Sequence, residues 1–281
     1  MDLGVGDARR GAADDFRDAE VAGGDADGVL GVLREVADMG GGRPEDVRLD
    51  VERDGEQALR ALAAGGQWSA PMVVRTPYGA GIRALEHHSE SLEGAYAHVP
   101  GLQVVIPSTP YDTKGLLKSA IRSPDPVLFM EPKHIYRSVR EDVPDDDYEV
   151  PIGEAAVRRE GEDVTVVSWG AMMQKTLEAV DRIDADAEVI DLRTISPMDR
   201  ETVVESVRKT GRCVVVHEAP YSGGWASEII ATINDEVLMY LEAPVESITG
   251  YDIPVPLLSM EDYYIPHPPR IAAGIEDVLD Y

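Results

Sequence analysis

The stretch "DVTVVSWGAMMQKTLEAVDRI", residues 163–183, predicts a buried β-strand followed by an amphipathic helix. Its first part is dominated by Val and Thr, and its second part repeats apolar residues at helical spacing. The same alternation continues to the C-terminus, with strands predicted at 187–192, 212–219 and 244–250 and helices at 199–209, 224–241 and 270–281. Near-continuous apolar strands separated by helices indicate a parallel sheet that is covered on both faces.

The preceding part of the chain shows a similar alternation. Strands are predicted at 71–76, 102–107 and 126–131, and a helix at 111–121 that Asp112 opens. Residues 140–150 are rich in acidic side chains and contain proline, which suits a connection between domains. The expected fold class is therefore α/β, with two parallel-sheet domains at residues 66–139 and 151–281.

Composition and charge exclude several classes of function. The chain has 281 residues, of which 43% are hydrophobic, and 53 acidic against 26 basic residues give a formal net charge of -27. Such a charge repels nucleic acid and anionic lipid. There is no apolar run near the roughly 20 residues that span a bilayer, and the N-terminus lacks a signal-peptide core. We expect a cytoplasmic protein that contacts no membrane, with a surface of the kind adapted to high salt.

Residues 1–65 differ in composition from the rest of the chain. They contain no Ile, Ser, Thr, Tyr, Asn, Lys, His or Trp, and are rich in Asp, Gly, Ala, Val and Arg. A segment without most of the strand-favouring residues does not easily form a packed sheet. Two interpretations stay open, a disordered acidic extension and the product of a GC-rich gene read in a shifted frame.

The loop "GIRALEHHSES", residues 81–91, holds the strongest candidate for chemistry. It follows a predicted strand, where ligands of parallel sheets collect, and Gly79 and Gly81 allow backbone turns. His87 and His88 have side chains that transfer protons near neutral pH, although most loop histidines are only solvated. Acyl transfer through Ser89 is disfavoured because the nucleophile-elbow pattern is missing.

Three further features receive structural interpretations. The turn "YSGGWASE", residues 221–228, places Ser222, Gly223 and Gly224 ahead of a predicted helix, and it fits ordinary helix capping with close packing better than an anion site. Cys213 is expected to be a small buried strand residue. For His217 and Glu218, at the end of a predicted strand, structural hydrogen bonding is favoured over chemistry.

Five stretches carry a family pattern: "APMVVRTPYGAGIRALEHHSES" (70–91), "GLQVVIPSTPYDTKGLLKSAIRSPDPVLFMEPKHIYRS" (101–138), "EVIDLRTISPMD" (188–199), "KTGRCVVVHEA" (209–219) and "ITGYDIPVP" (248–256). In order, they resemble the beta subunit of the E1 component of 2-oxo acid dehydrogenase complexes. These subunits lie within the transketolase-like thiamine diphosphate superfamily. The resemblance covers residues 66–281 and implies a transketolase-like pyrimidine-binding domain followed by a transketolase C-terminal domain.

The resemblance also implies partners and cofactors. An E1 alpha subunit would complete an alpha2beta2 heterotetramer and hold thiamine diphosphate with magnesium. The cofactor would decarboxylate a 2-oxo acid, and the acyl group would pass to the lipoyl group of the E2 acyltransferase. The family's active-site histidine corresponds to His88. By position, a potassium ion bound in some members corresponds to a separate set of residues: Ala120, Ile121, Ser123 and Asp125.

The chain departs from the family pattern in residues 1–65. The family has a glutamate there that binds the aminopyrimidine ring, and none of the five glutamates of this segment stands in that context. The pyrimidine-binding domain is therefore expected to be incomplete and to leave an exposed sheet edge. Two alternatives stay open, a noncatalytic assembly subunit that binds E1 alpha and E2, and half of a split transketolase-like enzyme. The sequence does not decide which 2-oxo acid is the substrate.

Overall fold

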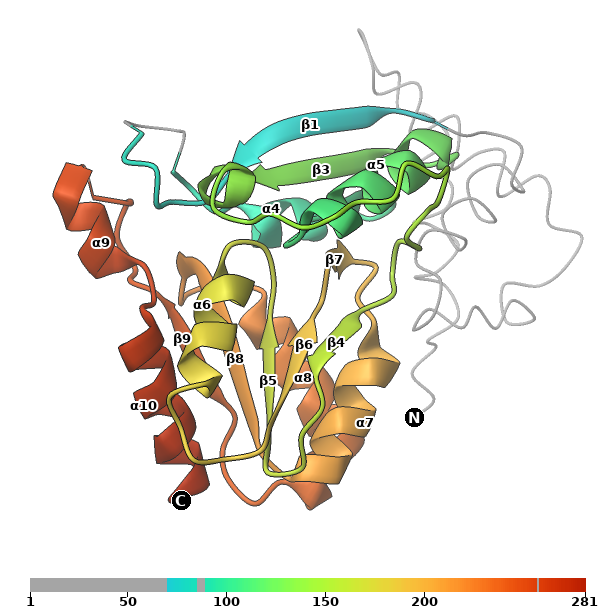
Figure 1. The fold of residues 1–281 in the computed structure, drawn as a ribbon. Coiled ribbons are helices and arrows are strands. Elements are labelled where there is room, and N and C mark those ends of the chain that lie inside the picture. Colours follow the sequence, from blue (N-terminus) through green and yellow to red (C-terminus); the bar gives the residue numbers. More distant parts are fainter. Residues whose placement is uncertain (1–69, 85–88, 257) are drawn as a thin grey trace, which may run out of the picture. The chain divides into compact units, whose positions relative to one another are not determined.

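The computed structural model describes residues 70–84, 89–256 and 258–281. The strands of these residues form two sheets, one of four strands and one of five (Figure 1). Residues 140–150, predicted to connect two domains, contain no helix or strand. The described residues contain no helix that is long and apolar enough to cross a membrane.

The first sheet has the strand order β1-β3-β2-β7. Its strands are β1 (Val73–Tyr78), β2 (Gln103–Val105), β3 (Val127–Pro132) and β7 (Thr194–Ser196). The predicted strands β1, β3 and β2 are parallel, whereas β7 comes from the second half of the chain and pairs antiparallel with β2. Sequence patterning missed β7 because three residues are too few to show a period.

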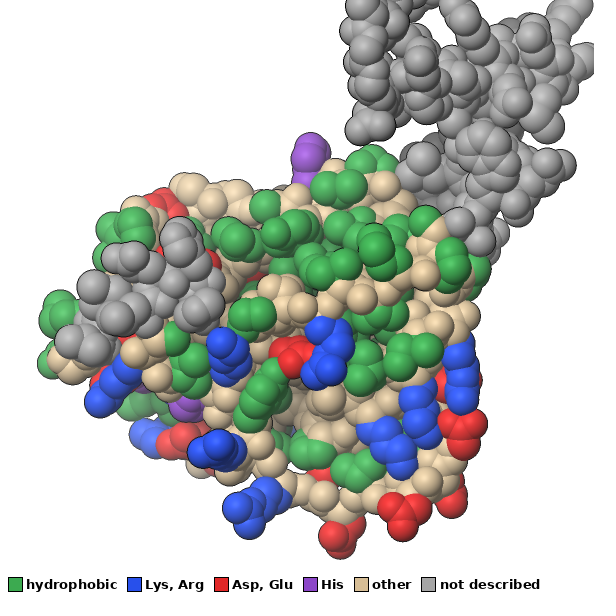
Figure 2. All heavy atoms as spheres, turned by 90° about the horizontal axis from the view of Figure 1, so that it is seen from above, with side chains coloured by type: hydrophobic (Ala, Val, Ile, Leu, Met, Phe, Trp, Pro, Cys, Tyr) green, Lys and Arg blue, Asp and Glu red, His purple; other side chains and the backbone are tan. Residues whose placement is uncertain are grey.

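Strand β1 is an edge of the first sheet, as far as the described residues go. Val74 of this strand is 45% exposed, and Met72, just before it, is 57% exposed. Figure 2 looks onto this side of the molecule and shows many hydrophobic side chains near the centre of the face. Among the described residues, β1 therefore has a neighbouring strand on one side only.

Helix α5 (Pro110–Arg122) packs its apolar side against β2 and β3. Its N-cap is Thr109, whose hydroxyl accepts a hydrogen bond from Asp112 N at 3.1 Å. The prediction that Asp112 opens the helix is wrong by three positions, because Pro110 fits the first helical turn and Thr109 supplies the cap. Two short helical segments that flank this sheet were not predicted: α4 (Glu93–Ala97) and η2 (Lys133–Tyr136).

The second sheet has the strand order β4-β6-β5-β8-β9. Its strands are β4 (Ala156–Arg159), β5 (Val164–Ser168), β6 (Ala187–Asp191), β8 (Cys213–Pro220) and β9 (Glu246–Gly250). The four predicted strands are parallel, and the unpredicted β4 pairs antiparallel with β6. Each sheet is thus parallel apart from one antiparallel edge strand. Cys213 is fully buried in β8, as expected.

Helices cover both faces of the second sheet (Figure 1). On one face lie α6 (Met172–Val180) and α10 (Pro268–Leu279), and on the other lie α7 (Arg200–Thr210) and α8 (Ala226–Val237). The predicted helix 224–241 is shorter than expected, because α8 ends at Val237 and one tighter turn, η3 (Leu238–Tyr240), follows. Two short segments precede α10: η4 (Leu258–Met260) and α9 (Glu261–Tyr264).

The two sheets share one hydrophobic core. The cluster beneath α7 and α8 continues through Trp169, which is 1% exposed, to Tyr78 and Ile106 of the first sheet. The carboxyl end of β1 and the residues after it are therefore held against Trp169, which follows β5, and against Glu218 of β8. This junction is where the candidate site lies.

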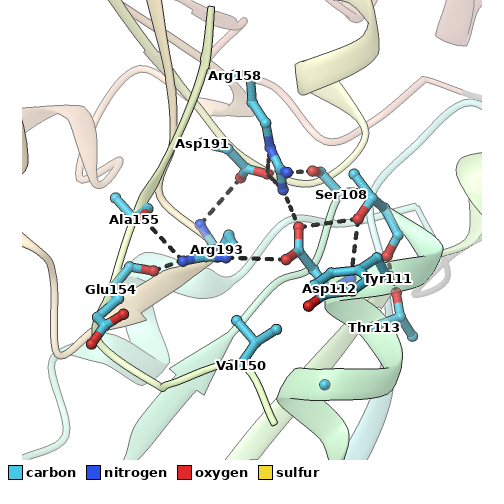
Figure 3. Close-up of polar contacts among 12 residues, drawn as sticks. Ser108, Tyr111, Asp112, Thr113, Val150, Glu154, Ala155, Arg158, Asp191 and Arg193 are labelled. Atoms are coloured by element: carbon cyan, nitrogen blue, oxygen red, sulfur yellow. Dashed lines mark hydrogen bonds and ion pairs between the residues drawn. The ribbon is translucent and has the colours of Figure 1, made fainter. Parts of the chain in front are cut away.

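A buried ionic network also links the sheets (Figure 3). Arg158 of β4 contacts Asp191 at 2.8 Å and also binds Asp112 of α5, while Arg193 contacts Asp112 at 3.1 Å. Ser108 donates a hydrogen bond to Asp191. Burial raises the pKa of Asp191, and the nearby Arg158 guanidinium opposes this rise. The network fixes the start of α5 to β4 and β6.

Candidate active site

The candidate loop joins β1 to α4 at the carboxyl end of the first sheet. His87 and His88 lie outside the described residues, as do the other members of 85–88. The two stems of the loop are described, Gly79–Ala84 on one side and Ser89–Leu92 on the other. Their contacts show how the fold holds the segment on which the predicted catalytic histidine stands.

Two hydrogen bonds close the loop at its base. Gly79 N donates to Glu90 O at 3.3 Å, and Ser89 Oγ donates to Ala84 O at 3.0 Å. Ser89 is 5% exposed, so its hydroxyl is enclosed where it makes this contact. The hydroxyl of Ser89 therefore stabilises the base of the loop. This contact agrees with the expectation that Ser89 is not an acyl-transfer nucleophile.

The first stem turns at two glycines, as the sequence predicts. Gly79 and Gly81 have φ angles of 79° and 96°, in the region that side chains rarely adopt. A Cβ atom at Gly79 would lie 2.6 Å from Glu218 Oε1, and one at Gly81 would lie 2.7 Å from His134 Nδ1. The space beside each glycine is thus filled by a side chain from a distant part of the chain.

Two glutamates of the second half bind this stem. Ala80 N donates to Glu218 Oε2 at 2.6 Å, and Gly81 N donates to Glu261 Oε1. On the other side, His134 Nδ1 lies 3.1 Å from Gly81 O, so Nδ1 must carry the hydrogen because a carbonyl oxygen only accepts. The structural role expected for Glu218 is confirmed.

A buried acid cluster lies behind the stem, made up of Glu93, Glu218 and Glu261. Their exposures are 0%, 2% and 1%. Tyr78 donates a hydrogen bond to Glu93 Oε1 at 3.0 Å and accepts one from Trp169 Nε1 at 3.3 Å. One oxygen of each glutamate has no hydrogen-bond partner within the described residues.

Burial sets the charge of this cluster. It raises the pKa of Glu93 to about 7, and it raises the pKa of Glu218 to about 8 although the hydrogen bond from Ala80 N lowers it. Glu218 is therefore largely protonated at neutral pH. Burial also lowers the pKa of His217 to about 4. The His217 ring stacks on Trp169 with centroids 5.3 Å apart, and its nitrogens bond to no described residue, so the hydrogen bonding expected of His217 is not found in this part of the chain.

An open depression of about 430 Å³ lies beside the second stem. It is lined by Glu90 and by residues that follow β8 and β9. Ser222 donates two hydrogen bonds to Asp252 here, at 2.8 Å from N and 2.7 Å from Oγ, whereas the N-cap of α8 is Trp225. No side chain of a described residue forms a capping hydrogen bond at the start of α8, so the ordinary capping expected of this turn is not found. The close packing is confirmed, since a Cβ at Gly224 would lie 2.7 Å from His217 Cε1.

The residues suggested for potassium lie elsewhere. Ala120, Ile121, Ser123 and Asp125 are at the C-terminal end of α5, before β3 begins, and hence at the opposite edge of the first sheet from the histidine loop. Ala120 O accepts a hydrogen bond from Ser123 N at 3.3 Å, and Ser123 Oγ accepts one from Asp125 N at 3.1 Å. Carbonyl, hydroxyl and carboxylate oxygens suit a hard cation. Within the described ranges, no cluster of three or more His, Cys, Asp or Glu residues could hold a metal.

Sequence reasoning missed most of the residues that hold the loop. Glu218 had one usable signal, its position at the carboxyl end of a parallel strand. Glu261 and His134 had none, because their positions depend on the short segments α9 and η2, which show no periodicity.

Comparisons with known proteins agree with this architecture. The model of the transketolase pyrimidine binding domain matches residues 55–139, and that of the transketolase C-terminal domain matches residues 153–271. A solved structure described as a split gene transketolase, inactive beta4 tetramer, superposes with a TM-score of 0.62 at 24% identity, covering 79% of this chain and 74% of the other. This structural likeness supports the fold. The chain is thus transketolase-like.

The curated relatives narrow the family further. The pyruvate dehydrogenase E1 component subunit beta of Acholeplasma laidlawii is 53% identical over 75% of this chain and 65% of its own length. The mitochondrial 2-oxoisovalerate dehydrogenase subunit beta of Dictyostelium discoideum is 50% identical over 80% and 62%. The pyruvate dehydrogenase E1 component subunit beta of Bacillus subtilis is 44% identical over 81% and 71%. The chain belongs to the family of E1 beta subunits of 2-oxo acid dehydrogenases, and its match spans less than two thirds of the first two relatives.

Proposed function

We propose that the chain is the beta subunit of a thiamine diphosphate-dependent 2-oxo acid dehydrogenase E1. In this role it takes part in the oxidative decarboxylation of a 2-oxo acid, with transfer of the acyl group to lipoyl-E2. The observation that carries the proposal is the 53% identity to an E1 beta subunit, which extends over 213 residues. The position of the loop supports it, because ligands of parallel sheets bind beyond the carboxyl ends of the strands.

We assign proton transfer to His88 and no catalytic role to His87. An imidazole beside the reacting centre stabilises developing charge and delivers a proton at neutral pH. The stems support this assignment, since hydrogen bonds and buried side chains hold both ends of the segment that carries His88.

Thiamine diphosphate and magnesium would be shared with an alpha subunit, which we propose as the partner in an alpha2beta2 assembly. Within the described residues, the buried carboxyl groups near the loop do not fit the role of the ring-binding glutamate. Glu93, Glu218 and Glu261 are enclosed, and the last two already accept backbone hydrogen bonds. None of these three carboxyl groups is therefore assigned to the aminopyrimidine ring.

Assembly with an alpha subunit tests the function. The full chain would be coexpressed with an E1 alpha subunit from the same organism, and decarboxylation of pyruvate and of branched-chain 2-oxo acids would be measured. We expect turnover that requires thiamine diphosphate, a loss of about 100-fold or more in His88→Ala, and a change of less than about threefold in the control His87→Ala.

Each other outcome has a meaning. A stable complex with alpha and E2 that shows no turnover would contradict the enzyme and favour a noncatalytic assembly subunit. Transfer of two-carbon units between sugar phosphates would favour half of a split transketolase. Comparison of the 2-oxo acids decides the substrate.

Potassium at the end of α5 is a separate proposal. The oxygens of Ala120, Ile121, Ser123 and Asp125 would hold it. We expect potassium chloride to raise the melting temperature more than sodium chloride at equal ionic strength, and Asp125→Ala to remove that difference. Equal effects of the two salts on the wild-type chain would argue against the site.

We further propose that residues 66–139 form a partial pyrimidine-binding domain, that 140–150 connect the domains and that 151–281 form the C-terminal domain. Residues 1–65 lie outside the described residues. For them we propose a frame-shifted reading of the gene. Translation of the upstream DNA in the other two frames tests this proposal, and the lack of an E1 beta start in both frames would contradict it.

A further inference from the structure

Two carboxyl groups from separate elements bind consecutive backbone amides of the histidine loop. Glu218 stands near the end of β8 and binds Ala80 N at 2.6 Å, and Glu261 is the first residue of α9 and binds Gly81 N. They lie 138 and 180 residues away along the chain from the amides that they bind. The stem thus depends on the second sheet and on α9 for its position.

The two glutamates leave the stem little freedom. Both are almost fully enclosed, at 2% and 1% exposure, and Glu218 fills the space where a Cβ of Gly79 would stand. His134 approaches Gly81 O from another element. The contact between Arg83 and Asp262 further along the stem is different, because its two side chains are 56% and 51% exposed and such pairs contribute little.

The geometry points to Glu218 and Glu261 as positioning residues that set the place of the stem Gly79–Ala84, and so support the reaction assigned to His88. This inference rests on the proposed function for the part that concerns His88, whereas the anchoring of the stem stands on the contacts alone. The two residues act through the backbone, so the reaction needs their acceptor oxygens and not their charge.

This distinction between acceptor and charge defines the variants. Glu→Gln at either position keeps an acceptor oxygen and the side-chain length, so it retains the anchor. Glu→Ala removes the acceptor, and Glu→Asp keeps the carboxyl group but shortens the side chain. Glu246→Ala is the matched control, because Glu246 is an exposed residue of the same sheet.

The first readout needs no enzyme activity. Hydrogen exchange of the full chain would be followed by mass spectrometry in the peptide over residues 79–84. We expect exchange in this peptide to be at least about tenfold faster in Glu218→Ala and Glu261→Ala, and nearly unchanged in the Gln variants and the control.

The second readout uses the complex with the alpha subunit. The Ala variants are expected to lower kcat about tenfold with little change in KM, and the Gln variants to restore it. A wild-type complex without turnover would count against the proposed function, while the exchange experiment would still decide the anchoring.

Three results would overturn the inference. One is hydrogen exchange in the peptide over residues 79–84 of the Ala variants at the same rate as in the wild type. Another is faster exchange throughout the chain, which would assign the glutamates to general stability. If the Ala variants do not fold, the Asp variants replace them. The third result is then hydrogen exchange in the Asp variants at the wild-type rate, which would also contradict the inference.

Discussion

Glu93 and Glu218 bind protons more tightly in the folded chain than in the unfolded one. Burial raises their pKa values from the ordinary 4.5 to about 7 and about 8. Because the folded state holds more protons above pH 4.5, the free energy of unfolding falls as the pH rises towards these values. His217 acts in the opposite sense, because burial lowers its pKa from 6.5 to about 4. Between these two values the unfolded chain holds more protons, so the free energy of unfolding falls as the pH falls from 6.5 to about 4.

Between about pH 7 and 8, His217 is mostly neutral in both states, because its pKa is 6.5 in the unfolded chain and about 4 in the folded one, so the slope there reports mainly on the two carboxyl groups. We expect Glu218→Gln to make the decline of unfolding free energy with pH shallower by up to about 1.4 kcal/mol per pH unit. Urea unfolding across this window measures the slope. Glu246→Gln serves as the exposed control, and a Glu218→Gln slope equal to that of the wild type would contradict the buried protonated state.

Gly79 and Gly223 form a matched pair for a second prediction. Their φ angles are 79° and 71°, so alanine costs about 1–2 kcal/mol of backbone strain at either position. A Cβ at Gly79 would lie 2.6 Å from Glu218 Oε1, while nothing lies within 4 Å at Gly223. We expect Gly79→Ala to destabilise by about 1–3 kcal/mol more than Gly223→Ala in urea unfolding. Equal costs would mean that Glu218 moves aside freely.

Among the elements, β4 and α5 are tied together by the network of Arg158, Asp112 and Asp191. Arg158 is 24% exposed, whereas the two carboxylates are 1% and 0% exposed. Removal of the Arg158 guanidinium leaves the two enclosed carboxylates with less positive charge nearby. The cost of leaving a buried charge without its partner exceeds the net stabilisation that the intact ion pair provides.

We therefore expect Arg158→Ala to lower the unfolding free energy by about 3–5 kcal/mol. Arg182→Ala is the control, because Arg182 and Glu178 form an exposed pair whose loss costs about 0.5 kcal/mol or less. Thermal or urea unfolding of both variants gives the comparison. A similar small loss in each would show that solvent reaches the network.

The elements also show what sequence patterning could find. Strands β5, β6 and β8 were predicted because each contains a short run of Val or Ile residues, which favour strands. Strand β4 was missed because two of its four residues are arginines, and β7 because it joins the first sheet from the second half of the chain. Pairing between distant segments leaves no periodic trace.

The residues of the candidate site also fall into two groups, those that the sequence could predict and those that it could not. The histidine loop was found from its place after a strand and from a family resemblance, and its turns at Gly79 and Gly81 follow from residue type. The anchors Glu218 and Glu261 come from contacts 138 and 180 residues apart in the sequence. Only packing of the second sheet and α9 against the stem brings these carboxyl groups to the loop, and no local pattern encodes that.

At the scale of the whole molecule, the chain carries a formal net charge of -27. Self-repulsion of this size destabilises a compact state, and salt screens it over a Debye length of about 10 Å at 0.1 M and about 3 Å at 1 M. Basic side chains offset only part of this repulsion, because 53 acidic residues stand against 26 basic ones. Stability should therefore depend on ionic strength.

We expect the melting temperature to rise between dilute buffer and molar potassium chloride. A variant with Glu205→Gln, Glu276→Gln and Asp277→Asn, all exposed positions on α7 and α10, removes three negative charges and should be more stable than the wild type in dilute buffer. Because less repulsion is left to screen, its gain from salt should be smaller. Scanning calorimetry across the salt series measures both effects, and an equal salt gain in the two proteins would attribute the stabilisation to stronger burial of apolar surface instead of charge screening.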